Sequence, residues 1–174
     1  MLFRSLGYMA SATHGSSIVF PTEAFSPSAT LLAVQEERAT ALYGVATMFS
    51  AELELLSNGT IADKGFENLR TGIAAGSSVP SVLMGKLHDR LNLKGLTICY
   101  GMTETAPVSC MTTPDDPIEK RLDSVGRLLP HVHAKVVSVT DPGRVVPIGE
   151  RGELAIAGYN VMSGYWGDEA RTAE

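Results

Sequence analysis

Between residues 28 and 99 the sequence alternates short apolar runs with segments in which apolar residues recur every three or four positions. The clearest of these segments is Val79 to Leu91, whose spacing predicts an amphipathic helix. Apolar runs at 69–74 and 96–99 stand before and after it and are candidates for strands. A strand, a helix and a second strand at such short intervals predict a parallel sheet covered by helices, which is an α/β fold.

Similar patterns predict further elements earlier in the chain, with strands at 16–20 and 41–45 and helices at 28–39 and 47–56. Thr47 is the expected cap of the second of these helices. Ser77 or Ser78 is the expected cap of the helix at 79–91, with Pro80 in its first turn. The Met and Phe side chains of the second helix are interpreted as core contacts rather than as a ligand site.

The character of the sequence changes after a loop rich in Pro and Asp at 112–117. The runs 134–139 and 153–157 alternate or are rich in β-branched residues, and an Asp-Pro-Gly turn signal lies between them. This pattern predicts antiparallel strands. The expected organisation is a partial α/β subdomain over residues 1–120, followed by a partial, small antiparallel β subdomain over residues 121–174.

The charge and composition of the sequence exclude several classes of function. Of the 174 residues 44% are hydrophobic and 19% are charged, which is ordinary globular composition. The formal net charge of −5 gives no electrostatic footprint for nucleic acid or for an anionic membrane surface. No apolar run approaches the length of a membrane span, and the first residues lack the pattern of a secretory signal. Cys99 and Cys110 are therefore expected as reduced thiols.

Both ends of the sequence look unfinished. The first residues already lie in apolar sequence, and 168–174 read as a helix that has just begun, with Asp168 as its cap. A helix this short with nothing to pack on is marginal. We therefore expect a piece of a longer protein, whose incomplete sheet exposes apolar edges and favours self-association.

Two loops follow strand candidates and carry the candidate site residues. Gly76–Ser78 offers backbone groups and hydroxyls with little bulk, and Tyr100–Glu104 offers an aromatic face, a hydroxyl and a carboxylate. Gly101 lets the backbone turn where a β-carbon would obstruct it. If the two strands are neighbours, both loops line one crevice at the carboxyl edge of the sheet. Such groups suit a nucleotide base, its phosphate and Mg²⁺.

The residues themselves also allow a purely structural interpretation. Tyr100–Thr105 is equally consistent with a strand end, a tight turn and a helix start that Thr103 or Thr105 caps. His131 and His133 would point to the same side of an extended stretch. No third metal ligand with suitable spacing stands nearby, so both histidines are expected to face solvent.

Several motifs in this order resemble those of the adenylate-forming enzymes, which include acyl-CoA synthetases, luciferases and peptide-synthetase adenylation domains. Tyr100–Thr105 (YGMTET) resembles the adenine and Mg²⁺ motif, and 71–80 (TGIAAGSSVP) resembles the adenine-binding loop. Residues 125–127 (VGR) and 152–166 (GELAIAGYNVMSGYW) resemble a later signature of the family. Residues 114–121 (PDDPIEKR) are most similar to the medium-chain acyl-CoA synthetase branch, near the mitochondrial family-member-2 type.

The resemblance implies a fatty acid, ATP and CoA as substrates. A carboxylate first forms an acyl-adenylate with ATP and releases pyrophosphate, and the CoA thiol then displaces AMP. Thr103 and Glu104 are the implied catalytic residues: Thr103 bonds the phosphate and Glu104 holds Mg²⁺. Tyr100 is implied to stack on adenine, and Val108 to border the acyl pocket beside Gly101 and Met102. The implied nucleotide site consists of Gly76, Ser77, Ser78, Tyr100, Gly101, Met102 and Thr103.

The sequence also departs from this family. The Gly/Ser/Thr-rich phosphate loop, the Thr-Gly-Asp segment whose Asp binds ribose, and the C-terminal adenylation lysine are absent from the 174 residues. Arg4 stands where the family has a histidine at the acyl pocket. We therefore expect a fragment of an ATP-dependent acyl-CoA ligase that is inactive by itself. The alternatives are a non-catalytic truncated paralogue that acts as a binding module, or a fragment of another adenylate-forming enzyme.

Overall fold

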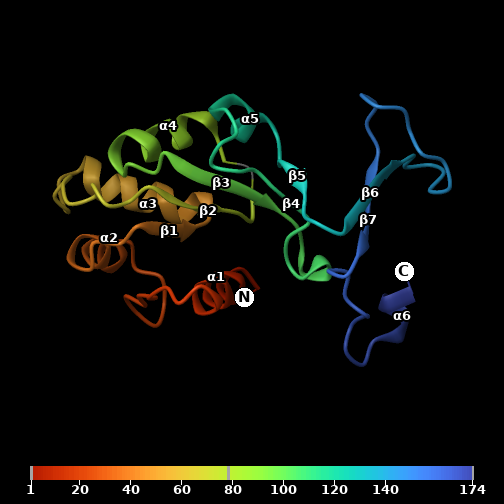
Figure 1. The fold of residues 1–174 in the computed structure, drawn as a ribbon, viewed down its shortest axis with the longest axis horizontal. Coiled ribbons are helices and arrows are strands. Elements are labelled where there is room, and N and C mark those ends of the chain that lie inside the picture. The colour runs from red at the N-terminus through yellow and green to blue at the C-terminus, as the bar shows by residue number, and fades with distance from the viewer. Residues whose placement is uncertain (1, 78, 174) are drawn as a thin grey trace.

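The computed structural model of the chain describes residues 2–77 and 79–173, and the side chains of 7–77 and 79–173. In this part of the chain the strands form two sheets (Figure 1). The larger sheet has the spatial order β1-β2-β3-β4-β5, and β6 and β7 form an antiparallel hairpin, so the expected fold class is confirmed. The strands are β1 (Ala41–Gly44), β2 (Thr71–Ala74), β3 (Gly95–Tyr100), β4 (Cys110–Met111), β5 (Arg127–Leu128), β6 (Val132–Val137) and β7 (Glu153–Gly158).

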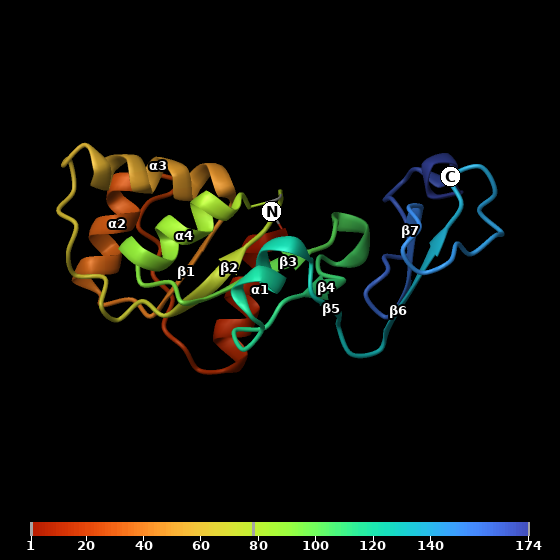
Figure 2. The same ribbon diagram turned by 90° about the horizontal axis from the view of Figure 1, so that it is seen from above.

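Helices connect the parallel strands and lie together in one layer. β1, β2 and β3 run parallel, with Ala41 opposite Thr71 and Thr71 opposite Gly95. Figure 2 shows the connecting helices α3 and α4 beside α2, along one side of the sheet. The helices are α1 (Leu2–Thr13), α2 (Pro27–Glu36), α3 (Ala46–Ser57), α4 (Ser81–Arg90), the 3-10 helix η1 (Thr103–Thr105), α5 (Ile118–Asp123) and α6 (Glu169–Ala173).

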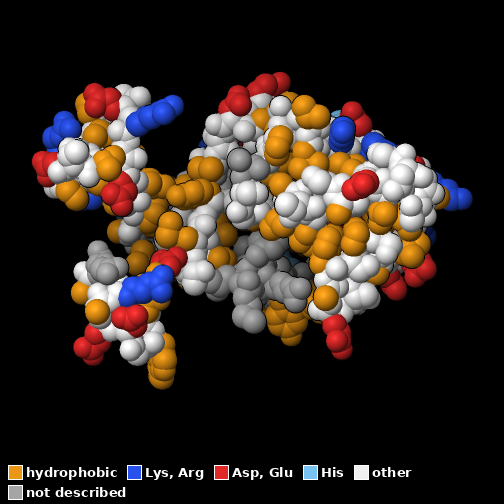
Figure 3. All heavy atoms as spheres, turned by 180° about the vertical axis from the view of Figure 1, so that it is seen from behind, with side chains coloured by type: hydrophobic (Ala, Val, Ile, Leu, Met, Phe, Trp, Pro, Cys, Tyr) orange, Lys and Arg blue, Asp and Glu red, His pale blue; other side chains and the backbone are white. Residues whose placement is uncertain are grey.

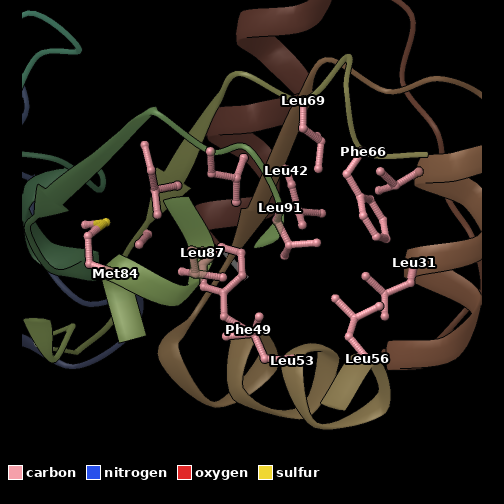
Figure 4. Close-up of a cluster of buried hydrophobic side chains, with 14 of the residues drawn as sticks. Leu31, Leu42, Phe49, Leu53, Leu56, Phe66, Leu69, Met84, Leu87 and Leu91 are labelled. Carbon is pink, nitrogen blue, oxygen red and sulfur yellow. The ribbon is translucent and has the colours of Figure 1, made fainter. Parts of the chain in front are cut away.

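The main hydrophobic core lies between this helical layer and the sheet (Figure 4). Phe49 of α3 is fully buried, and a β-carbon on Gly44 of β1 would lie 3.1 Å from its ring. Burial of one such side chain contributes about 1.5–3 kcal/mol. The buried side chains labelled in Figure 4 come from α2, α3, α4 and the strands and loops beside them, and are Leu31, Leu42, Phe49, Leu53, Leu56, Phe66, Leu69, Met84, Leu87 and Leu91.

The first part of the chain differs from the expectation. Residues 16–20 form no strand in the described structure, and Val19 and Phe20 are exposed. The prediction of a strand was wrong because this apolar run finds no neighbouring strand to receive its backbone hydrogen bonds. α1, which was not expected, precedes it and carries exposed apolar side chains such as Tyr8 and Met9.

The expected helix caps are also corrected by the structure. Thr47 lies inside α3, which begins after Val45 without a side-chain cap. Ser77 lies before Pro80, the residue that flanks the start of α4, and Ser78 lies outside the described residues. Polar side chains are favoured at helix starts, but they are not required where tertiary packing fixes the helix.

Two short strands that were not expected extend the sheet beyond β3. β4 and β5 run antiparallel, with Tyr100 opposite Cys110 and Cys110 opposite Leu128. Between them the backbones approach closely at Gly126, which has a φ of +84° and where a β-carbon would lie 2.1 Å from the carbonyl carbon of Met111. Strands of two residues carry no periodic pattern, so sequence reasoning could not find them.

A buried arginine fastens α5 to the same sheet. The Arg121 guanidinium donates hydrogen bonds to the carbonyl oxygens of Lys94 and Leu96, at 2.9 and 2.8 Å. Its Nε donates to the carbonyl oxygen of Asp116 at 3.1 Å. α5 is therefore attached to the larger sheet, and β5 is a strand of it. The separate hairpin β6-β7 begins only after residue 128. The expected division of the chain into two subdomains at residue 120 stays a prediction.

The hairpin β6-β7 with its connecting loop and the end of the chain around α6 project from the α/β part as two lobes (Figures 1 and 3). Apolar side chains are exposed here, including Ile148, Tyr159 and Trp166. Their exposure is compatible with the self-association that the sequence predicts, which stays a prediction. No helix in the described part of the chain is both long and apolar enough to cross a membrane.

Glu52 of α3 is a carboxylic acid inside this fold. Its side chain is 1% exposed, and Oε2 has no hydrogen-bond partner among the described residues. Burial raises the pKa of the carboxyl group from 4.5 to about 8. Glu52 is therefore protonated in the folded chain at neutral pH, whereas it is ionised in the unfolded chain.

This difference predicts a pH dependence of stability. Because the folded chain keeps a proton that the unfolded chain releases, the free energy of unfolding should fall as the pH rises from about 4.5 through about 8. Glu52→Gln keeps a neutral side chain, so its stability relative to the parent should improve between pH 5 and pH 8 by on the order of 3 kcal/mol. Thermal unfolding followed by circular dichroism at both pH values measures this change.

The matched control is Glu54→Gln, since Glu54 lies on the same helix and is exposed. It should change the unfolding temperature by a similar amount at pH 5 and at pH 8. An equal effect of Glu52→Gln at the two pH values would contradict the assignment of Glu52 as the buried acid.

Candidate functional site

The two candidate loops leave the sheet at the same edge. β2 and β3 are parallel neighbours, and their last paired residues are Ala74 and Ile98. The loop after β2 contains Gly76, with a φ of +83°, and Ser77, and both are exposed. Ser78 lies outside the described residues. The structure therefore brings the described part of the first loop to the edge from which the loop after β3 departs, as the sequence predicted.

The loop after β3 turns at Gly101, where the backbone approaches a later part of the same loop. A β-carbon on Gly101 would lie 2.0 Å from the carbonyl oxygen of Pro107, which confirms the steric reason for glycine. η1 follows directly. The hydroxyl of Thr105 accepts a hydrogen bond from the backbone N–H of Met102 at 3.1 Å. Met102 occupies the cap position of η1, so neither Thr103 nor Thr105 is the helix cap that was expected.

The remaining candidate residues of this loop differ in their burial. Tyr100 is half-buried at the end of β3, and its carbonyl oxygen accepts a hydrogen bond from the N–H of Ser109 at 2.8 Å. Met102 and Thr103 are exposed at the edge of the sheet. Val108 is buried beside Ala75. The exposed residues are thus the ones that a ligand at this edge would contact.

Glu104 is held from the segment that follows β7. Its Oε1 accepts a 2.5 Å hydrogen bond from the hydroxyl of Tyr165, and its carbonyl oxygen accepts one from the N–H of Met162 at 2.9 Å. Asn160, which is buried, donates from Nδ2 to the carbonyl oxygens of Thr105 and Val108, at 3.1 and 3.2 Å. Sequence reasoning recognised the 152–166 block but assigned none of these residues to the site.

The surroundings of Glu104 favour its ionised form. The hydrogen bond from Tyr165 is the largest cause that lowers the pKa of this carboxyl group, followed by the backbone N–H of Glu104 itself. Partial burial opposes them, and the positive charge of Arg171 adds a smaller lowering effect. An ionised carboxylate is the ligand that a hard cation such as Mg²⁺ prefers.

Glu104 is suited to bind a cation that is also bound by the phosphates of a nucleotide. Among the described residues no group of three or more His, Cys, Asp and Glu side chains could hold a metal ion. Mg²⁺ is usually bound through one or two carboxylates together with substrate phosphates and water, so one glutamate at a phosphate site is sufficient as the protein ligand. Glu104 therefore fits Mg²⁺ as a partner of a phosphate, not as part of a closed protein cage.

The cysteines and histidines do not add to this site. Cys99 and Cys110 are free and buried, and burial raises the pKa of both thiols, that of Cys99 to about 11. Their reduced state stays a prediction, and neither buried thiol has the character of a nucleophile. His131 and His133 are both exposed, as expected.

Two shallow hollows occur elsewhere on the surface. One, of about 440 Å³, is lined by 163–167, Glu169, Thr172 and Ala173, and the other, of about 400 Å³, lies between α3 and α4. Neither lies between the Gly76 loop and the Tyr100 loop. The residues of the two candidate loops therefore line neither of these two hollows.

The close approach at Gly101 generates a testable prediction. In Gly101→Ala the added methyl group would overlap the carbonyl oxygen of Pro107, so the loop has to shift and the chain should lose about 1–3 kcal/mol of stability. Denaturant unfolding measures this loss. Gly85→Ala is the control, because a β-carbon there has no atom within 4 Å and Gly85 lies inside α4. It should be neutral or stabilising, and an equally mild Gly101→Ala would contradict the steric argument.

Comparisons with known proteins agree with the resemblance read from the motifs. The family described as AMP-binding enzyme matches residues 1–166. Acyl-CoA ligase sidI of Aspergillus fumigatus is 47% identical over 169 residues, which are 97% of this chain and 28% of that protein. Medium-chain acyl-CoA ligase ACSF2, mitochondrial, of Mus musculus is 37% identical over 168 residues, 97% of this chain and 27% of that protein. The chain thus spans little more than a quarter of the length of these relatives.

Solved structures agree in fold. o-Succinylbenzoate CoA synthetase (MenE) from Bacillus subtilis, in complex with the acyl-adenylate intermediate OSB-AMP, has a TM-score of 0.79 and 25% identity over 99% of this chain and 33% of that chain. The same synthetase in complex with AMP has a TM-score of 0.75 and 26% identity, over 96% of this chain and 32% of that chain. Since the family match runs from residue 1 to residue 166 and the fold agrees with it, the chain belongs to the family of AMP-binding enzymes.

Proposed function

We propose that these residues form one wall of the nucleotide and acyl site of an ATP-dependent acyl-CoA ligase. The observation that carries the proposal is the parallel pairing of β2 with β3, because it gives the Gly76 loop and the Tyr100–Thr105 loop one common edge. The names of the relatives support the reaction class, since several are acyl-CoA ligases at 37–47% identity. The ACSF2 relatives support a medium-chain fatty acid as the acyl substrate.

The proposed reaction has two steps. A carboxylate oxygen of the fatty acid attacks the α-phosphorus of ATP, the bond from that phosphorus to the bridging oxygen breaks, and pyrophosphate leaves. The thiolate of CoA then attacks the acyl carbon and AMP leaves with the oxygen that joined them. Both steps move negative charge onto phosphate oxygens, so groups that hold those oxygens and their cation lower the barrier.

The described residues offer a role for each part of the nucleotide. The ring of Tyr100 provides a face for adenine, and the loop at Gly76 and Ser77 borders it with little steric bulk. The exposed hydroxyl of Thr103 can donate to a phosphate oxygen. The ionised Glu104 would hold Mg²⁺, which when bound neutralises charge on the phosphates. Gly101 and Met102 would lie toward the acyl group.

The 174 residues by themselves should not form acyl-CoA. They contain no Gly/Ser/Thr-rich phosphate loop and no adenylation lysine of the kind found in the family, and loss of one such charge-stabilising group costs several kcal/mol in the barrier. Incubation of the purified chain with ATP, Mg²⁺, CoA and octanoate, followed by chromatography of acyl-CoA, measures this. Octanoyl-CoA above the protein-free blank would refute the prediction.

Nucleotide binding tests the proposed wall directly. We expect the chain to bind ATP at millimolar concentration and more tightly with Mg²⁺ than with EDTA, as measured by thermal shift and calorimetric titration. Tyr100→Ala should weaken binding about tenfold in both conditions because base–aromatic stacking is lost. Glu104→Gln should remove the effect of Mg²⁺ and leave binding in EDTA unchanged.

Tyr159→Ala is the control for the loss of an aromatic ring, since Tyr159 is exposed, follows β7 and is not one of the residues placed against the nucleotide. It should bind ATP as the parent chain does. Absence of any ATP effect on the parent chain would overturn the proposed nucleotide site and favour a non-catalytic binding module.

A further inference from the structure

We propose that Tyr165 is a positioning residue for the carboxylate of Glu104, which it holds in the orientation that the cation requires. The proposal rests on the proposed function, since it takes Glu104 as the ligand of Mg²⁺. The contact joins residues 61 positions apart in the sequence, through a 2.5 Å hydrogen bond from the Tyr165 hydroxyl to Oε1.

Tyr165 is itself held by two contacts from α6. Its backbone N–H donates to the hydroxyl of Thr172 at 2.9 Å, and the guanidinium of Arg171 lies 4.4 Å from the centre of its ring. Both partners belong to α6, whose start Asp168 caps by accepting a 3.0 Å hydrogen bond from the N–H of Arg171. The phenol therefore reaches Glu104 from a supported position, not from a free loop end.

The main chain of the Glu104 loop is fixed by the same segment. Met162 donates its N–H to the carbonyl oxygen of Glu104, and the buried Asn160 bridges the carbonyl oxygens of Thr105 and Val108. With its backbone held at one point and Oε1 at another, the Glu104 side chain keeps few of its rotamers. Ordering a glutamate side chain costs conformational entropy. Because these contacts order Glu104 already in the folded chain, a ligand loses less affinity to this cost when it binds.

The chemistry of the contact also suits a cation ligand. The Tyr165 hydroxyl donates to one carboxylate oxygen, Oε1, and is itself neutral, whereas a lysine or arginine in the same place would neutralise the carboxylate. The hydrogen bond from Tyr165 fixes Oε1 by its direction and adds no positive charge of its own at the carboxylate. Tyr165 touches neither substrate nor metal in this scheme and acts only through Glu104.

The first experiment requires no ligand. Unfolding temperatures of the 174-residue chain, Tyr165→Phe, Glu104→Ala and the double variant form a double-mutant cycle. Each single variant breaks the same contact between Tyr165 and Glu104. We therefore expect the sum of the two single-variant decreases in unfolding temperature to exceed the decrease in the double variant by about 2 °C or more. Additive shifts would show that the two side chains are not coupled in solution, and would overturn the proposal whatever the chain binds.

The second experiment uses ATP as the probe, with the ratio of its affinity in Mg²⁺ to that in EDTA as the readout. Tyr165→Phe should lower this ratio about threefold to tenfold, while the affinity in EDTA stays that of the parent chain. Tyr159→Phe loses a hydroxyl from an exposed tyrosine six positions earlier and should keep the parent ratio. A purely structural role of Tyr165 would weaken ATP binding equally in both conditions.

The outcomes separate this proposal from the proposed function. If Glu104→Gln abolishes the Mg²⁺ effect and Tyr165→Phe leaves it intact, positioning by Tyr165 is wrong and the nucleotide site stands. If the parent chain shows no Mg²⁺ effect on ATP binding, the proposed site fails, and the contact between Tyr165 and Glu104 is a structural link without a role toward a cation. Coupling in the cycle together with a lowered ratio supports the proposal.

Discussion

The parallel hydrogen bonding of β2 to β3 determines where the two loops with the candidate site residues lie. Strands that run in the same direction end at the same edge, so the loop at Gly76 and the loop after Tyr100 share that edge. The close spacing on the other side of β2 depends on Gly72, where a β-carbon would lie 1.9 Å from the carbonyl oxygen of Leu42. The fully buried Phe49 and its neighbours then press the connecting helices against the strands. The core thus fixes the edge before any ligand is considered.

The part of the fold between residues 41 and 100 could be predicted because its signals are local. Apolar spacing at 79–91 and the runs beside it identify a strand, a helix and a strand, and that unit alone implies a common edge for its loops. The exact helix starts could not be read in this way. Val45 and Pro80 precede α3 and α4 without side-chain caps, because packing against the sheet replaces the hydrogen bond that Thr47 or Ser77 was expected to give.

Contacts between distant parts of the chain escaped sequence reasoning. The motif at 152–166 was recognised, and it contains Asn160, Met162 and Tyr165. The side chains of Asn160 and Tyr165 form hydrogen bonds to residues 52 to 61 positions earlier in the sequence. No local sequence pattern indicates such pairs. β4 and β5 have two residues each, too few for a periodic signal. Glu52 resembles an ordinary polar position of an amphipathic helix, and only the three-dimensional structure reveals its burial.

The links from the segment after β7 to Glu104 also bear on motion. Because Met162 holds the main chain and Tyr165 holds the side chain of Glu104, a displacement of the segment after β7 relative to the sheet would carry the carboxylate with it. Any such coupling would be thermodynamically reciprocal: if a ligand of the carboxylate shifted the orientation of this segment, a molecule bound to the segment would shift the affinity for that ligand by the same factor. A projecting, weakly packed lobe thereby becomes a second place from which ligand affinity could be adjusted.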